Sequence, residues 1–517
     1  MSWRSILSRG ARRISTRAVE AIRDTLSEEV GPVDTDLALQ GAMAACIELA
    51  ATRYAVDPGA QWSPGEPLKL LLAGYAGSRN TGADARVEEM CKQLRHLVGD
   101  EHLELSILTI DPERTRGYFP TVRQYTLPNV YPKFITDLVH TQHGVLACEG
   151  SMFKSKFANA LSTLMVGALG LASVENKIAV GYGGEAGTMD PSLEAMVRRY
   201  CRDALIIARN TQSREVLSRL GVESRAGTDT AWTYDCPLEP GQQLLRDAGW
   251  DGVQPVLAVC PINAFWWPVK PDVARGVAHW ATGAWKDAHY SGPYFHNDAE
   301  GIAEAQGRYL DGIVAGVAAF LAETDAFVAL VGMEMLDRRA CDGLNERFER
   351  VLGRSFPLFV SDDHDHVPMI GLLRSARWLV SSRYHAIVCS MPGGTASAGI
   401  TMDERIRNLM ADRGTPELAL ETTDPDLGTH LLTVLRTLRD EEARVVDGIG
   451  RCVATTLVRM GQMGIDLVDH LRARHPELPI DPRFGSGGDG PLAHLPPLAP
   501  GQQALIDAHR PPGALAS

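Results

Sequence analysis

The 517-residue sequence predicts an α/β fold made of two Rossmann-like, doubly wound domains that face a cleft. Two observations predict it. Short apolar runs alternate with helical patterns in both halves of the chain, and glycine-rich or polar segments follow many of these runs. Strands that alternate with helices imply parallel sheets with right-handed crossovers. Because such sheets bind ligands beyond the carboxyl ends of their strands, a cleft between the domains would collect these segments.

The chain is too long for a single hydrophobic core, so several domains are expected. Breaks in composition and in periodicity divide it into six regions. These are a basic N-terminal tail (1–33), a first Rossmann-like domain (34–235), a linker (236–254), a second Rossmann-like domain (255–428), C-terminal helices (429–475) and a Pro/Gly-rich, poorly ordered tail (476–517).

The first domain opens with an Ala-rich helix predicted for 34–56 and a buried strand at 68–73. A glycine-rich loop (74–82) follows this strand and leads into a helix at 84–98, which has apolar residues at helical spacing. Four more strands are predicted at 103–110, 144–148, 177–181 and 204–208, and a helix at 211–220.

The second domain repeats the alternation after the linker. A strand at 255–260 precedes a long helix at about 302–321 and a second strand at 326–331. The remaining predicted elements are strands at 357–360, 378–381 and 396–400, and short helices at 368–374 and 386–390.

Charge and cysteine usage exclude several classes of protein. The net charge of −13 argues against a general nucleic-acid-binding surface, so an anionic ligand would need a local cluster of arginines. The nine cysteines form no C-x-x-C pair, which argues against a zinc knuckle and a disulfide framework and fits a reducing cytoplasm. No apolar run reaches the length needed to cross a bilayer.

The N-terminal segment has its own charge pattern. Residues 1–23 contain six arginines and one acidic residue, with Trp3, Ile6 and Leu7 among them. One interpretation is a basic helix through which residues 1–25 contact an anionic membrane surface, at the inner face of the membrane. The other interpretation is a solvated, partly helical tail.

The glycine-rich loop is the first candidate for a ligand site. It contains Gly74, Gly77 and Gly82 but matches neither G-x-G-x-x-G nor a P-loop. Glycines allow a tight turn and close backbone approach, and the helix after the loop presents free N–H groups. The loop therefore serves either ligand binding or simple strand-to-helix packing.

The segment Ser382-Arg383-Tyr384-His385 is the sharpest local feature, because it joins a predicted strand to a helix at the cleft. His385 can exchange a proton near neutral pH. Arg383 offers a planar fork to a carboxylate or a phosphate. The alternative is a histidine that caps the helix and an arginine that pairs with a surface acid.

Two further arginines follow predicted strands. Arg209 comes directly after the strand at 204–208 and should face the cleft. Arg405 lies beyond the strand at 396–400, in an acidic segment where a solvated or paired charge is the alternative. Neither residue alone distinguishes a ligand contact from a structural ion pair.

Two other clusters invite a functional interpretation. The run Asp362–His366 has the side chains of metal ligands, but neighbouring ligands in one loop rarely close a site, so no metal is predicted. A group of aromatic rings either stacks on a sugar or adenine ring or packs in the core. This group consists of Trp266, Trp267, Tyr290, Tyr294 and His296.

Together, three segments resemble motifs of the polysaccharide pyruvyl transferase family. Residues 74–82 look like its G-Y-x-G-x-x-N-x-G loop, and residues 208–222 are similar to its V-R-D-x-x-S-x-x-x-L-x-x-L-G-V segment. Residues 381–386 look like its S-x-R-L-H-A signature. The likeness is scattered over 68–415. The chain departs from the family pattern at Ala83, Asn210 and Met402.

The resemblance implies a glycosyltransferase-B-like fold and a cytoplasmic transferase that moves pyruvate from phosphoenolpyruvate onto a sugar of a glycan or lipid-linked precursor, as a ketal. It implies no metal and no cofactor besides the donor substrate. A nucleotide-sugar-dependent glycosyltransferase and a non-catalytic binding protein on the same fold are the alternatives. The implied site consists of His385 as the catalytic residue and Arg209, Arg383, Arg405, Gly77, Asn80 and Gly82 as substrate-binding residues.

Overall fold

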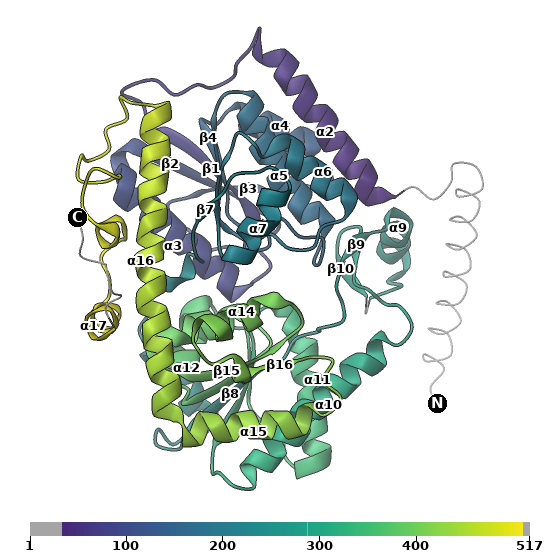
Figure 1. The fold of residues 1–517 in the computed structure, drawn as a ribbon. Coiled ribbons are helices and arrows are strands. Elements are labelled where there is room, and N and C mark those ends of the chain that lie inside the picture. The colour runs from purple at the N-terminus through teal and green to yellow at the C-terminus, as the bar shows by residue number, and fades with distance from the viewer. Residues whose placement is uncertain (1–33, 287, 510–517) are drawn as a thin grey trace.

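The computed structural model describes residues 34–286 and 288–509, and two parallel β-sheets form its framework (Figure 1). The first sheet has the strand order β3-β2-β1-β4-β5-β6-β7, and all neighbouring strands are parallel. Its strands are β1 (Leu68–Ala76), β2 (Leu103–Thr109), β3 (Arg123–Thr126), β4 (Gly144–Ala147), β5 (Ile178–Gly184), β6 (Leu205–Ala208) and β7 (Arg225–Ala226).

Helices cover both faces of the first sheet. The buried side chains of five helices form one hydrophobic cluster on one face, and α3 contributes to a second cluster on the other. Central strands are therefore buried on both faces and consist almost wholly of apolar residues. The helices are α2 (Thr35–Tyr54), α4 (Pro132–His140), α5 (Asn159–Val174), α6 (Pro191–Tyr200) and α7 (Thr211–Arg219), opposite α3 (Thr81–Val98).

The second sheet has the order β13-β12-β8-β14-β15-β16 and is also parallel throughout. With the first sheet it forms two Rossmann-like halves, which confirms the predicted fold class, glycosyltransferase-B-like in its arrangement (Figure 1). The strands are β8 (Val256–Cys260), β12 (Phe327–Gly332), β13 (Leu358–Val360), β14 (Trp378–Ser381), β15 (Ala396–Thr401) and β16 (Ala419–Glu421).

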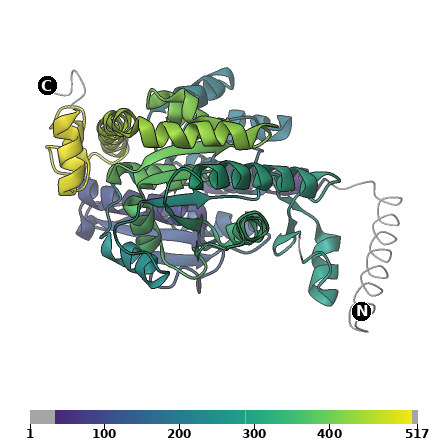
Figure 2. The ribbon, with the colours of Figure 1, turned by 90° about the horizontal axis from the view of Figure 1, so that it is seen from below.

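Two groups of helices pack around the second sheet. Helix α10 contacts both α11 and α15, and Figure 2 shows α10 and α15 running side by side. Helix α12 contacts α8 and α13, whereas α14 lies against β15. The bounds are α8 (Glu239–Asp247), α10 (Ile302–Leu321), α11 (Arg338–Leu352), α12 (His366–Ser375), α13 (Tyr384–Ser390), α14 (Glu404–Asp412) and α15 (Leu427–Asp440).

The long helix α16 (Glu442–Arg474) connects the two halves. It contacts α3 and β7 of the first half and β15 of the second, and Figure 1 shows it running along both. One hydrophobic cluster accordingly contains Leu70 of β1, Val380 of β14 and Val453 of α16. The C-terminal helices are therefore part of a shared core, because α16 covers apolar surface that each half exposes.

Two predicted segments differ from the structure. The segment predicted as a linker (236–254) contains α8, which packs closely on α12 of the second half. The segment predicted as a poorly ordered tail is packed as far as residue 509, with η6 (Pro491–His494) and α17 (Pro500–Ala508) against α16. Phe484 and Leu495 are buried there, so the apolar residues spaced among the prolines decide the structure of this segment.

A small insertion between β8 and α10 was not predicted. It contains β9 (Lys270–Pro271), α9 (Val273–Thr282), β10 (His289–Ser291) and β11 (Tyr294–Phe295). The three strands form an antiparallel sheet of order β10-β11-β9, which lies at the side of the molecule with α9, near the start of α2 (Figure 1). Strands of two or three residues give too little periodicity to be recognised in a sequence.

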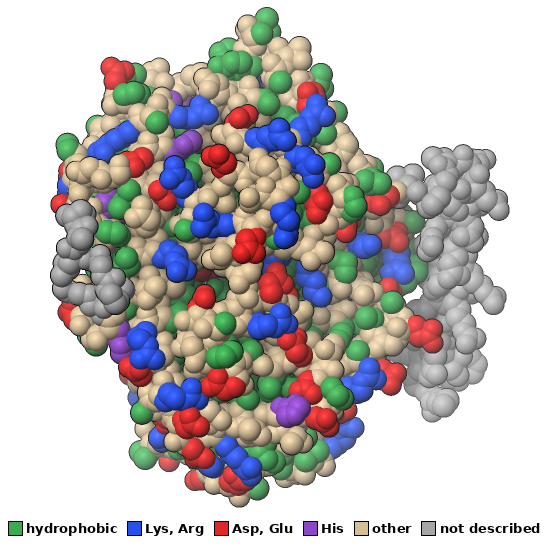
Figure 3. Space-filling view, in the orientation of Figure 1, with side chains coloured by type: hydrophobic (Ala, Val, Ile, Leu, Met, Phe, Trp, Pro, Cys, Tyr) green, Lys and Arg blue, Asp and Glu red, His purple; other side chains and the backbone are tan. Residues whose placement is uncertain are grey.

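The surface and the termini bear on the remaining predictions. Basic and acidic side chains are interspersed on the face shown in Figure 3, without a continuous basic field. In the described part of the chain, no helix combines the length and apolar character that crossing a membrane requires. All nine cysteines are free thiols, as expected. The predicted basic tail (1–33) lies outside the described residues.

Close packing of α8 on α12 makes a prediction about two helical glycines. A Cβ on Gly241 would lie 2.0 Å from the backbone nitrogen of Leu372, so we expect Gly241→Ala to lower the free energy of unfolding by about 1–3 kcal/mol. Gly41 of α2 has no neighbour within 4 Å, so Gly41→Ala is the matched control and should raise stability by roughly 0.5–1 kcal/mol. Urea unfolding measures the free energy of unfolding of both variants. Equal changes in that free energy would contradict the close packing of α8 on α12.

Candidate functional site

A cavity of about 200 Å³ lies between the two halves, as the cleft prediction requires. Its walls come from loops at the carboxyl ends of strands in both sheets. The first half contributes the turns after β1, β2, β3 and β4, and the second half contributes the turns after β8, β12, β14 and β15. The polar and charged side chains among its lining are Asn80, Glu149, Ser151, Ser291, Glu334, Ser382, Arg383, His385 and Arg405, with Asn129.

His385 lines this cavity from the turn between β14 and α13, with 12% of its side chain exposed. Its Nε2 lies 3.2 Å from Oδ2 of Asp229, a fully buried carboxylate of the first half. Burial lowers the pKa of His385, and the charge of Asp229 opposes this shift. His385 is therefore a neutral proton acceptor near neutral pH, held in place by a carboxylate.

Asp229 is shared by three partners. Besides His385, it contacts Nε of Arg86 at 3.1 Å and Nη2 of Arg209 at 2.9 Å. Burial alone would raise the pKa of Asp229, but Arg86, Arg209 and His385 hold it well below its ordinary value. The carboxylate of Asp229 thus stays ionised, and it holds the side chains of Arg86, Arg209 and His385 around it.

Arg209 does not line this cavity but lines a smaller hollow between the two halves, together with Glu185, Tyr384 and Arg405. It is buried behind Gly150 and Tyr384, with its guanidinium 5.0 Å from the Tyr384 ring centre. A Cβ on Gly150 would lie 2.3 Å from Nη2 of Arg209, so only glycine permits this close approach. Because Asp229 is its nearest carboxylate, Arg209 acts on the cavity through Asp229 and His385.

Arg383 does line the cavity, but carboxylates already occupy its fork. Its Nε donates to Asp337 at 2.7 Å, and its Nη2 lies 2.7 Å from Glu334. Burial raises the pKa of Glu334 and of Asp337, although Arg383 opposes both shifts. The site therefore contains a buried arginine between two acids, one of which, Glu334, faces the cavity.

Arg405 lines the cavity and pairs with the residue that caps its own helix. Its Nε lies 2.8 Å from Asp403, and its guanidinium lies 4.7 Å from the ring centre of Phe157. Each of the three predicted arginines thus has a carboxylate partner. Pairing was the alternative interpretation of these arginines from the sequence, and an anionic donor would have to share or displace their carboxylate partners.

The glycine-rich loop combines packing with a contribution to the cavity wall. Gly77 has a φ of +95° and lies away from the cavity, where its turn approaches Asp111 closely. Asn80 caps α3 and lines the cavity. A Cβ on Gly82 would lie 2.2 Å from Cβ of His385, so Gly82 leaves the space that the histidine occupies. Of the three loop residues, only Asn80 reaches the cavity with its own atoms.

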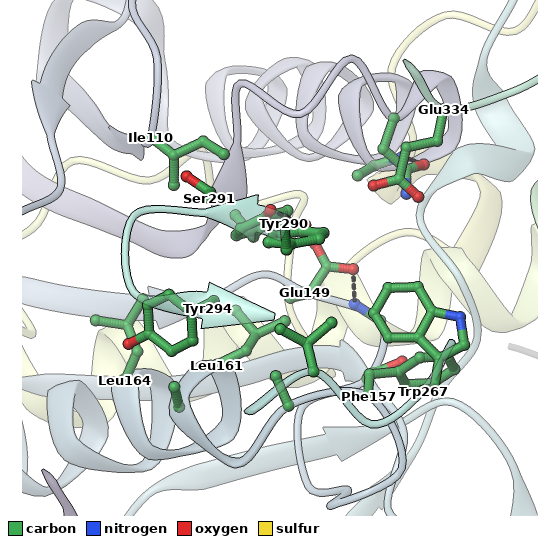
Figure 4. A pocket seen from close by; sticks show the side chains of 18 of the residues that line it. Ile110, Glu149, Phe157, Leu161, Leu164, Trp267, Tyr290, Ser291, Tyr294 and Glu334 are labelled. Atoms are coloured by element: carbon green, nitrogen blue, oxygen red, sulfur yellow. Dashed lines mark hydrogen bonds between the residues drawn. The ribbon is translucent and has the colours of Figure 1, made fainter. Parts of the chain in front are cut away.

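Aromatic and aliphatic side chains form the opposite part of the wall. In Figure 4, Tyr294, which comes from the hairpin of β10 and β11, lies beside Leu164 of α5, and Tyr290 of the same hairpin lies next to Glu149. Trp267 lines this cavity, whereas Trp266 lines a second hollow with His296, whose ring lies 4.1 Å away. The structure thus places part of the aromatic group at the cavity, as its functional interpretation requires.

The Asp362–His366 run joins the two halves. Asp365 pairs with Arg79 of the glycine loop at 2.7 Å, and His366 contacts Glu88 of α3 at 2.8 Å. Among the described residues, no group of three His, Cys, Asp or Glu side chains is arranged to hold a metal ion. The run therefore acts as an ion-paired contact between the halves.

Sequence reasoning missed four charged residues of the site: Arg86, Asp229, Glu334 and Asp337. Glu334 is the second residue after β12, so its position near a strand end could have indicated it. Asp229 and Arg86 come from a loop and a helix that no local pattern connects. Only the fold brings them to within 3.1 Å of each other.

No family model matches the chain, and no curated protein matches its sequence. Several solved structures are similar at low identity. A glycosyltransferase from Rickettsia africae has a TM-score of 0.47 at 10% identity, with 80% of this chain and 99% of that chain covered. A putative UDP-N-acetylglucosamine 2-epimerase from Listeria monocytogenes has a TM-score of 0.45 at 12% identity, with 75% and 95% covered. Similarities this low assign no activity to this chain.

The shared carboxylate predicts a pH-dependent loss of stability. Asp229→Asn leaves the buried Arg86 without its charge partner, so we expect it to cost about 3–5 kcal/mol of unfolding free energy at neutral pH. Because the pKa of Asp229 is lowered in the folded state, its contribution is fully present above its ordinary value of 3.8. The difference between parent and variant should therefore shrink only as the pH falls below that value.

Urea unfolding at several pH values measures this difference. Asp235→Asn is the control, because Asp235 pairs with Arg374 while 57% of its side chain is exposed, so its loss should cost less than about 1 kcal/mol. Equal costs for the two substitutions would contradict the role assigned to Asp229.

Proposed function

We propose that this chain is a transferase that moves pyruvate from phosphoenolpyruvate onto a sugar as a ketal. The observation that carries the proposal is the position of His385. It comes from the segment that resembles the S-x-R-L-H-A signature, lines the cavity between the halves, and contacts a carboxylate that two arginines keep ionised. The acceptor would be a sugar of a glycan or a lipid-linked precursor.

The proposed reaction needs one group that moves protons. His385, neutral near neutral pH, takes the proton of a sugar hydroxyl as its oxygen bonds to C2 of phosphoenolpyruvate, and C3 receives that proton. A second hydroxyl of the sugar then bonds to C2, the bond between C2 and the phosphate oxygen breaks, and inorganic phosphate leaves with the second proton. The scheme uses no metal ion and no organic cofactor.

Donor binding involves the arginines of the cavity wall. Phosphoenolpyruvate carries a carboxylate and a phosphate, and Arg383 and Arg405 both face the cavity. Because Glu334 shares Arg383, the donor competes with this carboxylate for the guanidinium. Trp267 and the hairpin tyrosines provide apolar faces on which the acceptor sugar can stack.

The proton-transfer role predicts the effect of His385→Gln. We expect phosphate release from phosphoenolpyruvate, measured with a panel of nitrophenyl glycosides as acceptors, to fall roughly 10²–10⁴-fold in kcat. The affinity for phosphoenolpyruvate, measured by calorimetry, should change little. His430→Gln is the control, because His430 is exposed on α15 and should leave both quantities unchanged.

Ligand-induced thermal stabilisation distinguishes this proposal from its alternatives. Full phosphate release by His385→Gln would contradict the role of the histidine. Protection from thermal unfolding by a nucleoside diphosphate, but not by phosphoenolpyruvate, would instead favour a nucleotide-sugar-dependent glycosyltransferase. Binding of a sugar without turnover of either donor would favour a non-catalytic binding protein.

The buried Glu334 makes donor binding depend on pH. Its pKa is raised by burial, so below that pKa the side chain is neutral and leaves Arg383 more available to the donor. We expect Glu334→Gln to bind phosphoenolpyruvate roughly tenfold more tightly than the parent at neutral pH. The ratio of the two dissociation constants should approach one as the pH falls.

Calorimetric titration across the pH range measures this ratio. Ionisation of phosphoenolpyruvate affects both dissociation constants equally, so it does not change their ratio. Glu349→Gln is the control, since Glu349 is exposed on α11. A ratio that does not change with pH would contradict competition between Glu334 and the donor.

A further inference from the structure

Helix α9 carries an exposed apolar stripe. Val273, Val277 and Trp280 have exposed fractions of 61%, 63% and 87%. Their spacing of four and three residues places them on one face of the helix. An almost fully exposed tryptophan next to two exposed valines is unusual for a soluble surface and marks a contact site.

The opposite face of α9 is anchored to the insertion. The ring of His279 stacks on His289 of β10 at 3.9 Å, and the guanidinium of Arg275 lies 5.9 Å from the ring centre of Phe295. Asp272 caps the helix by accepting from the backbone N–H of Arg275. The helix is therefore held against β10 and β11 through polar and aromatic contacts, and the apolar stripe is left facing outward.

The same insertion forms a wall of the cavity. Tyr290 and Tyr294 line the cavity from the hairpin, and α9 precedes this hairpin in the chain (Figure 1). A neighbouring loop repeats the arrangement: Leu127 and Pro128 line the cavity, while Val130 is 78% exposed. Apolar side chains thus occur both on the outer surface and on the cavity side of the same small region.

A basic segment of the sequence precedes the helix that begins next to the stripe. The first described helix, α2, begins beside α9, because Oγ1 of Thr35 donates to the backbone oxygen of Pro271 at 2.9 Å. The sequence that precedes this point contains six arginines and one acidic residue within positions 1–23. An apolar stripe and a basic segment connected to the chain at one place are the two signals that bind a protein to an anionic bilayer.

We propose that α9 docks on an anionic lipid surface, with Val273, Val277 and Trp280 inserted at the level of the lipid headgroups. Tryptophan favours this interface because its ring is apolar and its N–H is polar. A second protein chain is a poorer occupant, because stable protein interfaces use roughly 20–30 residues on each side, against three side chains here. Docking places the insertion, and with it the cavity wall, next to the bilayer.

This proposal stands on the surface of α9 and does not depend on pyruvyl transfer. If both hold, the acceptor is a sugar attached to a lipid, and it reaches the cavity past the hairpin without leaving the membrane. If only docking holds, vesicle binding persists whatever donor the cavity takes. Vesicle binding and donor binding are therefore measured separately.

The test is co-sedimentation of the full chain with vesicles of equal parts phosphatidylcholine and phosphatidylglycerol. Replacing Val277 by Asn together with Trp280 by Ser should weaken vesicle binding by about tenfold or more, since these side chains lose their apolar contact with lipid. Val351→Asn is the matched control, because Val351 is 61% exposed on α11 and should bind as the parent does. Thermal unfolding should be the same for all three proteins, as every substituted side chain is exposed.

Varying the ionic strength separates the contribution of the basic segment from that of the apolar α9 stripe. High salt screens the arginines, so the binding that remains should depend on the α9 stripe and be lost in the double variant. Binding by the double variant equal to that of the parent would overturn the proposal, as would a parent that does not sediment with these vesicles. A dimer that forms in solution and is abolished by the double substitution, without vesicle binding, would assign the stripe to a second copy of the chain.

Discussion

The cleft depends on one buried carboxylate. Asp229 contacts Arg86 and Arg209 of the first half and His385 of the second, so a single ionised group connects the two Rossmann-like sheets at the point where they meet. A carboxylate in this position is stable only while its partners surround it, because an isolated buried charge is strongly disfavoured. This interaction therefore fixes the orientation of His385, and it contributes to the relative position of the two halves together with α16 and the ion pairs of Asp365 and His366.

Pairing of opposite charges extends through the rest of the cavity. Arg383 lies between Glu334 and Asp337, and Arg405 lies on Asp403. This pairing explains how a protein with a net charge of −13 keeps arginines in a buried site. An anionic ligand at these arginines would share or displace a carboxylate, so its binding would depend on the protonation of the buried acids.

The two structural additions to the Rossmann-like halves have different roles. Helix α16 covers apolar surface on both halves and gives them a common core. The insertion with α9 adds little to that core, since the outer face of its helix is exposed, and instead contributes aromatic rings to the cavity. Helix α16 holds the halves together, and the insertion shapes the cavity between them.

The sequence by itself determined most strands of the two parallel sheets and several of the helices between them, because these elements follow from local hydrophobic period. It predicted the strand β14 and the turn that carries Arg383 and His385, and it placed Arg405 after β15. It did not predict α8, the packing of residues 476–509, or the partnership of Asp229 with Arg86, 143 residues away along the chain. These elements and contacts depend on which surfaces meet after folding, and no local sequence pattern indicates which surfaces those are. Only the tertiary structure decided that Arg209 lies behind the cavity wall, because the contact between its guanidinium and Asp229 forms only when β6 and the loop after β7 come together.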